Sequence, residues 1–155
     1  MRILILLLIL SSAISCGSPA ASLPELDLMA HGLPIKLKAP EGSKVVMSDM
    51  GLMKDVTVTN GDSYALQIFS TDIISNNMDD IKQERLREVK NNPFFSKVVV
   101  DEAAGFIFEK VRPDSTKNYD FRHIRFQGDK QYIFQTSMIG SFSKEDVESM
   151  YDSVK

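Results

Sequence analysis

Three side chains on one short stretch of the chain, Arg122, His123 and Arg125, are the first candidates for chemistry. A histidine can serve as a general base near neutral pH, and its serine and acid partners can come from distant parts of a sequence. Two neighbouring arginines offer bidentate hydrogen bonds to an anionic group. The stretch therefore supports two hypotheses: a hydrolase centred on His123, and a ligand-binding site formed by all three residues.

No recognisable catalytic motif accompanies His123. The sequence lacks Gly-x-Ser-x-Gly, His-Glu-x-x-His and Cys-x-x-Cys patterns, and it has no phosphate-binding glycine loop. A strand histidine is more often a surface or hydrogen-bonded structural residue, and strand arginines commonly pair with acids such as Glu109 and Asp120. We therefore favour a protein that is not an enzyme and needs no cofactor, with the hydrolase kept as the alternative.

A second candidate site is a methionine cluster. Met47, Met50 and Met53 recur at every third position around Gly51. Thioether sulfur is a soft ligand that suits Cu(I), so this spacing permits a copper-binding loop. The alternative is that these flexible side chains fill irregular gaps where a loop folds over the core.

Length and composition restrict the class of protein. The chain has 155 residues, a formal net charge of −3 and a single cysteine. That length suits one domain with a substantial core, and one cysteine cannot form an intrachain disulfide. A mildly acidic chain lacks the basic footprint of a nucleic-acid-binding protein, so we expect no nucleic-acid partner.

The beginning of the chain has the three parts of an export signal. Arg2 is basic, Ile3–Leu10 is an apolar run, and small residues follow up to Cys16. Such a run is too short to span a bilayer, which needs about 20 apolar residues. Ala13-Ile14-Ser15-Cys16 resembles the lipobox of bacterial lipoproteins, which prefers Leu at the position of Ala13.

The lipobox resemblance implies cleavage before Cys16 and attachment of lipid to its thiol. Two or three acyl chains there would anchor the protein to a membrane. We expect residues 1–15 to be the signal peptide, 16–34 the lipidated cysteine with a flexible tether, and 35–155 one globular domain. Gly17 after the cysteine implies, by the same resemblance, the periplasmic face of the outer membrane over the inner membrane.

The apolar pattern of the globular part predicts strands with two helices. Alternating residues begin at Ile35, and the turns Asn60-Gly61 and Gly128-Asp129 are strong hairpin signals. Asn77 can cap a mid-chain helix that ends near Lys90. Ser143 caps a C-terminal helix with one apolar stripe, formed by Val147, Met150, Tyr151 and Val154.

Several strands are apolar on both faces, as where Phe106 and Phe108 alternate with Ile107. Such strands belong to a sheet that is covered on at least part of each face. We therefore predict an α+β fold: a mostly antiparallel sheet covered by the mid-chain helix and the C-terminal amphipathic helix, as an α/β/α sandwich.

This order of elements, with the opening segment Pro34-Ile35-Lys36-Leu37-Lys38-Ala39-Pro40-Glu41-Gly42, resembles the Mog1/PsbP-like group of folds over residues 33–155. The resemblance implies a binding or accessory role more than an enzymatic one, and no functional residue carries over. We therefore expect a lipid-anchored cell-envelope protein that binds a partner protein or a small ligand without catalysis. A hydrolase using His123 and a copper-binding methionine loop are the alternatives.

Overall fold

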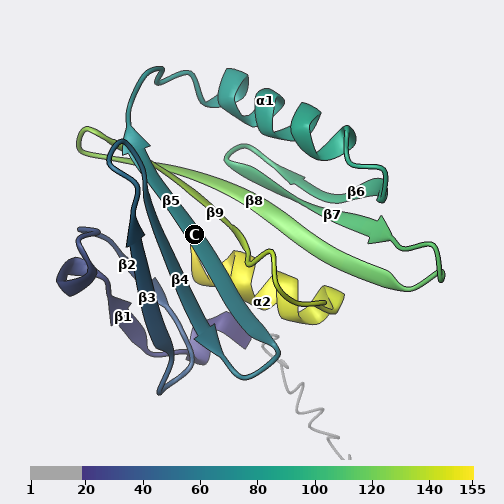
Figure 1. Ribbon diagram of the computed structural model, residues 1–155, viewed down its shortest axis with the longest axis horizontal. Helices are drawn as coiled ribbons and strands as arrows, with labels where there is room; N and C mark the ends of the chain where they lie inside the picture. Colours follow the sequence, from purple (N-terminus) through teal and green to yellow (C-terminus); the bar gives the residue numbers. More distant parts are fainter. Residues whose placement is uncertain (1–18) are drawn as a thin grey trace, which may run out of the picture.

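The computed structural model describes residues 19–155, and its main element is a seven-stranded, fully antiparallel sheet (Figure 1). Its strands lie in the order β3-β4-β5-β9-β8-β7-β6. The bounds are β3 Lys44–Asp49, β4 Lys54–Asn60, β5 Tyr64–Asp72, β6 Phe95–Glu102, β7 Gly105–Val111, β8 Lys117–Gln127 and β9 Lys130–Thr136. The predicted α+β class with a mostly antiparallel sheet is confirmed.

Both predicted hairpins are present, with different turns. Asn60 pairs with Tyr64, so a three-residue turn joins β4 to β5, whereas Gln127 pairs with Lys130 across a two-residue turn. The glycine of each turn, Gly61 at φ +58° and Gly128 at φ +63°, adopts the left-handed conformation that L side chains disfavour. Each hairpin turn therefore depends on its glycine, which adopts this backbone conformation without strain.

Helix α1 (Met78–Lys90) covers one end of one sheet face (Figure 1). It begins where expected, because the Asn77 side chain accepts hydrogen bonds from the backbone of Asp79 and Asp80. Its apolar stripe, with Leu86 and Val89, packs on Phe106 and Phe108 and on the adjoining part of β6. The remaining strands, β3, β4, β5, β8 and β9, contribute no residue to this cluster.

Helix α2 (Lys144–Ser153) lies on the opposite face. Ser143 and Asp146 form a reciprocal capping box at its start. The predicted stripe is fully buried and packs on Phe121, Phe134 and other residues of the main core; its members are Val147, Met150, Tyr151 and Val154. Strand β7 is buried on both faces, because Ile107 joins this core while its neighbours Phe106 and Phe108 join the cluster under α1.

The segment before the main sheet corrects one expectation. From residue 19 to residue 34 the chain is not a flexible tether: it contains two 3-10 turns, η1 (Pro19–Ser22) and η2 (Met29–His31), and strand β1 (Glu25–Asp27). β1 pairs with β2 (Lys36–Lys38) in a separate two-stranded sheet. Leu28 and Leu33 are almost completely buried in the main core. These two leucines, which stand between polar and small residues in the sequence, pack the segment onto the sheet.

The expected signal peptide, with Cys16 and its lipid, falls outside the described residues. Among residues 19–155, no helix is long and apolar enough to cross a membrane.

Candidate functional site

The structure separates the three basic residues that the sequence grouped together. Successive side chains of a strand point to opposite faces, and β8 places Arg122 on the α1 face and His123 and Arg125 on the α2 face. The proposed common site of Arg122, His123 and Arg125 is therefore wrong. Strand alternation alone predicts that adjacent residues 122 and 123 diverge.

His123 is a core residue. Its side chain is 8% exposed, and its ring packs 5.9 Å from the ring of Phe134 and edge-on, at 5.7 Å, against that of Tyr151. Its buried Nδ1 has no hydrogen-bond partner among residues 19–155, so neither a serine nor a carboxylate orients it there. Burial, together with the charges of Arg125 and Lys155, lowers the pKa of His123 to about 4. Nothing in this geometry resembles a catalytic dyad.

Arg125 connects three parts of the fold. Its guanidinium donates hydrogen bonds to the backbone carbonyls of Lys36 in β2 and of Val154 at the end of α2. It also lies 5.1 Å from the centre of the Phe134 ring, within cation–π range. Arg125 therefore fixes the N-terminal segment and the C-terminal helix to the sheet.

The methionine cluster is also divided. Met47 lies on the edge strand β3, and its sulfur approaches Gly32 in the N-terminal segment. Met53 lines a cavity on the α1 face, and Met50 is exposed in the turn between them. The arrangement does not converge three thioethers on one point. Within residues 19–155, no group of three or more His, Cys, Asp or Glu side chains could hold a metal ion either.

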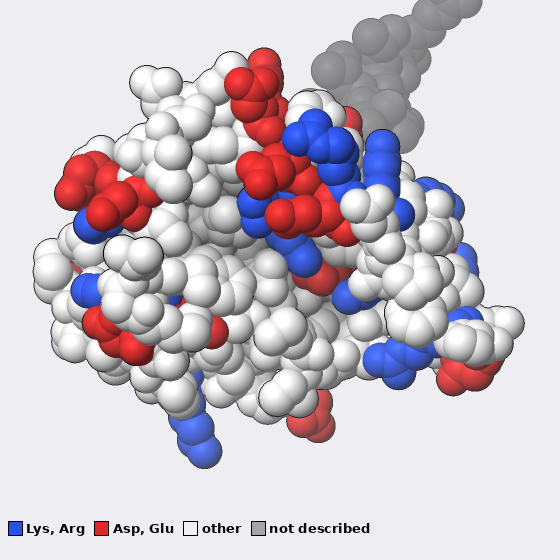
Figure 2. Space-filling view, turned by 45° about the horizontal axis from the view of Figure 1, so that its top comes forward, with Lys and Arg blue, Asp and Glu red and all other residues white. Residues whose placement is uncertain are grey.

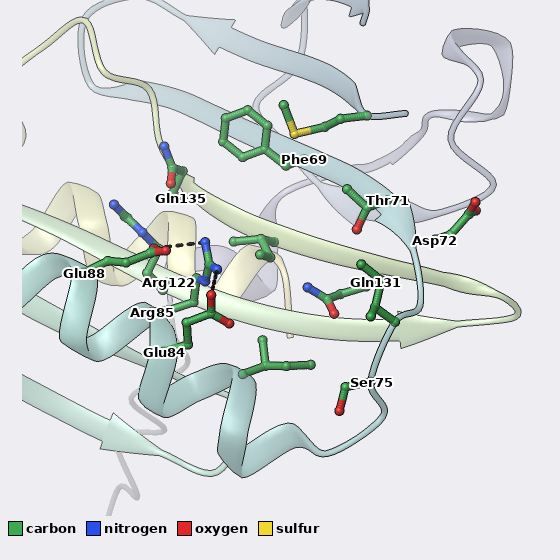
Figure 3. Close-up of a pocket in the computed structure, with 14 residues that line it drawn as sticks. Phe69, Thr71, Asp72, Ser75, Glu84, Arg85, Glu88, Arg122, Gln131 and Gln135 are labelled. Carbon is green, nitrogen blue, oxygen red and sulfur yellow. Dashed lines mark ion pairs between the residues drawn. The ribbon is translucent and has the colours of Figure 1, made fainter. Parts of the chain in front are cut away.

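A cavity lies between α1 and the part of the sheet that α1 leaves uncovered (Figure 3). It has a volume of about 530 Å³, within the range of small-molecule sites. Its apolar side is formed by Met53, Phe69, Ile81 and Ile133, and polar side chains of β5 and β9, including Thr71, Gln131 and Gln135, lie among them. We call the exposed surface of β4, β5 and β9 on this side the open face.

A row of hydrogen-bonded side chains crosses the open face. Gln135 of β9 donates through Nε2 to Oε1 of Gln67 at 3.2 Å, and Gln67 donates through its own Nε2 to Asp55 of β4 at 2.9 Å. Gln67 lies directly opposite Gln135 in the β-ladder. The chain of bonds orients both amides and leaves Oε1 of the half-buried Gln135 as an acceptor with no protein donor among the described residues.

The charged groups beside the cavity are neutralised within the protein. Arg85 of α1 forms ion pairs with Glu84 at 3.0 Å and Glu88 at 2.9 Å, as Figure 3 shows. Arg122 pairs with the buried Asp120 at 3.0 Å and lies over the Phe108 ring. Both arginines are paired with acids of the protein, so neither is available to neutralise a strongly anionic ligand in the cavity.

The buried carboxylate of Asp120 positions Arg122 beside the cavity. It accepts hydrogen bonds from the Thr136 hydroxyl at 2.6 Å and from Lys110 at 3.2 Å, besides its pair with Arg122. Burial by itself raises the pKa of Asp120, but Arg122, Lys110 and Thr136 together hold that pKa below its usual value. The carboxylate therefore stays charged and fixes Arg122 at the rim of the cavity.

The sequence predicts these strands but not this site. The polar residues Gln67, Gln131 and Gln135 alternate with buried apolar ones, which is a signal for a strand with one less covered face. Only the position of α1 over β6 to β8 shows which part of that face stays open (Figure 1).

Comparisons with known proteins assign no family to the chain. No protein-family model matches it, and no curated protein does. A solved structure that does match is a crystal structure at 1.50 Å resolution from Bacteroides thetaiotaomicron VPI-5482, with 13% sequence identity and a TM-score of 0.40. The match covers 76% of this chain and 43% of the other, so this chain spans less than half the length of that protein.

Proposed function

We propose that the protein is a lipid-anchored, non-catalytic binding protein of the cell envelope, with its ligand site on the open face beside α1. The observation that carries the binding role is the cavity of about 530 Å³ with an apolar side and oriented amides. His123 is buried and its Nδ1 has no hydrogen-bond partner among the described residues, which favours binding over hydrolysis. Met50 is exposed in a turn while Met53 lines the cavity, which favours binding over a copper site in the methionine loop.

The binding site is testable with a library of chemically diverse fragments. Fragments that bind should shift the methyl NMR signals of Ile81 and Ile133, which both line the cavity. Thr71→Trp should abolish these shifts by filling the space, whereas Ser63→Trp, in the exposed β4–β5 turn, should not. A library that leaves both methyl groups unchanged in the unmodified protein contradicts the proposal.

The anchor is proposed from the sequence, through Ala13-Ile14-Ser15-Cys16. Cells grown with a clickable fatty acid should label the protein, and Cys16→Ser should abolish that label. Retention of the label in Cys16→Ser refutes lipidation at this position. By the same proposal, Gly17 favours the periplasmic face of the outer membrane, where an envelope protein partner would also be found.

We also propose that the domain belongs to the Mog1/PsbP-like group of folds. The antiparallel sheet, the helix between β5 and β6, the late β8–β9 hairpin and the final helix support this assignment. The group includes binding and accessory proteins, which agrees with the proposed role, although a shared fold does not itself assign an activity.

A further inference from the structure

The open face is longer than the cavity beside α1. A second hollow of about 710 Å³ lies on the same side, bounded by Val46, Thr57 and the loop from Ser137 to Phe142. Gln67 lines this second hollow, whereas Phe69, two residues along the same strand, and Gln135, opposite Gln67, line the first. The two hollows therefore adjoin along β5. From Thr71 to Ala65 they extend for about 20 Å.

This length suits an extended ligand better than a compact one. The surface offers two half-buried apolar side chains, the planar ring of Phe69 and the aliphatic Ile133, next to the amides of Gln131 and Gln135. Each amide provides donors and an acceptor in one plane. Gln131 makes no side-chain hydrogen bond within residues 19–155 that would occupy it, and Gln135 retains its free Oε1.

The charges of the region exclude a polyanion. Arg85 and Arg122 are paired with their own acids, as described above. On the face shown in Figure 2, acidic and basic side chains are intermixed and separated by broad uncharged areas. Without an extended patch of one sign, neither a phosphate-rich nor a strongly cationic ligand has an electrostatic advantage.

An extended peptide fits the open face less well. Peptides commonly bind by adding a strand at a free sheet edge. β5 lies between β4 and β9, and β9 lies between β5 and β8, so their backbone groups already pair on both sides. Recognition on this face must therefore come from side chains alone.

We infer that the open face binds an uncharged glycan segment. A pyranose ring has an apolar C–H face that can lie on Phe69 and Ile133, and its hydroxyl groups both donate to and accept from amides such as Gln131 and Gln135. Gln67 and Asp55 act as positioning residues, because they hold the Gln135 amide in place. The inference rests on the proposed binding function of the same cavity and names the class of ligand.

The test uses the whole mature chain, residues 16–155, with Cys16→Ser to keep it in solution. The probes are neutral tetrasaccharides of β1,4-linked N-acetylglucosamine and of β1,4-linked glucose, an uncharged tetrapeptide, and decanoate. Binding is measured by calorimetry and by the methyl NMR shifts of Ile81 and Ile133. We expect one tetrasaccharide to bind and to shift both signals.

Matched variants locate the contact. Gln135→Ala should weaken tetrasaccharide binding by about tenfold or more, as the loss of a hydrogen-bonding partner does. Gln83→Ala, on an exposed position of α1, should not change it. Phe69→Ala should weaken binding, whereas Phe94→Ala, another partly exposed aromatic outside both hollows, should leave it unchanged.

The outcomes separate the two proposals. If the tetrapeptide or decanoate shifts Ile81 and Ile133 and neither tetrasaccharide does, the glycan inference is overturned and the binding site stands. If a tetrasaccharide binds equally well to Gln135→Ala and to unmodified protein, the glycan inference is also overturned. If no probe shifts either methyl group, the glycan inference fails, and the fragment library then decides whether the cavity binds any ligand.

Discussion

The ring of His123 occupies a place where a positive charge is unfavourable. It is buried between aromatic rings, and its pKa is lowered from the ordinary 6.5 to about 4 by burial and by Arg125 and Lys155. Below pH 6.5 the unfolded chain takes up a proton at this residue and the folded chain does not. The free energy of unfolding should therefore fall as pH falls from 6.5 towards 4.

We predict that His123→Phe weakens this pH dependence. Phenylalanine keeps an aromatic ring against Tyr151 and removes the buried Nδ1 that lacks a partner. At pH 7 the change in unfolding free energy should stay within about 1 kcal/mol. Relative to unmodified protein, the variant should gain about 1.5 kcal/mol between pH 6.5 and pH 5. Urea melts at each pH measure this, and parallel pH profiles contradict it.

The opposite orientation of Arg122 and His123 could have been predicted from the sequence. Once residues 117–127 are recognised as a strand, alternation separates neighbours and joins His123 with Arg125. A common site for all three residues would need β8 at an edge of the sheet, where side chains from both faces can meet. β8 is instead an inner strand, flanked by β7 and β9. Strand order depends on long-range pairing, which local sequence does not specify.

The C-terminal helix could be predicted closely because its signals are local. The cap at Ser143 and the apolar spacing that includes Met150 depend on nearby residues only, and both appear in the structure. The N-terminal segment could not, because its docking depends on a hydrophobic surface formed by distant strands. Leu28 and Leu33 are isolated apolar residues in a Pro- and Ser-containing stretch, without a periodicity that indicates burial.

Helix α2 should contribute strongly to stability. Met150 has no exposed surface and packs in the main core. We predict that Met150→Ala lowers the unfolding free energy by about 2–5 kcal/mol, the range for large-to-small core substitutions. Glu148→Ala, which removes only an i,i+4 pair with Lys144 on the same helix, should cost about 0.5 kcal/mol. Equal, small effects in denaturant melts would mean that α2 is not docked in solution.

The N-terminal segment provides a second test of packing. Leu33 is 1% exposed, within a stretch that the sequence suggested was a tether. Leu33→Ala in the chain from Gly17 onward should lower the unfolding free energy by about 2–4 kcal/mol. Met29→Ala, in the same segment but 62% exposed, should change it by less than about 0.5 kcal/mol. If Leu33→Ala is also neutral, residues 19–34 are a tether after all.

A docked N-terminal segment also limits how far the protein can extend from a membrane. Three peptide units separate Cys16 from Pro19, where η1 begins, and they span at most about 11 Å. If Cys16 carries lipid, the folded part lies directly at the bilayer surface, and its position is set by η1 and its contact with α2. Because η1 packs on α2, such an anchor would leave the chain on the side of the sheet opposite the open face.

The two edges of the sheet differ in how they resist association. β6 contains two register shifts, and Lys97 and Asp101 are exposed along it. β3 pairs with β4 in unbroken register; its charged residues, Lys44 and Asp49, are at its two ends, and its middle exposes Val46 by 65% and Met47 by 46%. Bulges and charges are the usual protection of an edge strand, and an even, apolar edge is a template for pairing with another chain.

We predict that aggregation on heating begins at β3. Val46→Lys places a charge on that edge and should reduce turbidity at a given temperature, with a change of less than about 0.5 kcal/mol in unfolding free energy because the position is exposed. Ser63→Lys adds the same charge in the exposed β4–β5 turn and should leave turbidity unchanged. If both variants suppress turbidity equally, net charge and not the edge is responsible. If neither does, association starts elsewhere, and the exposed pair Met138 and Ile139 in the loop before α2 becomes the next position to substitute.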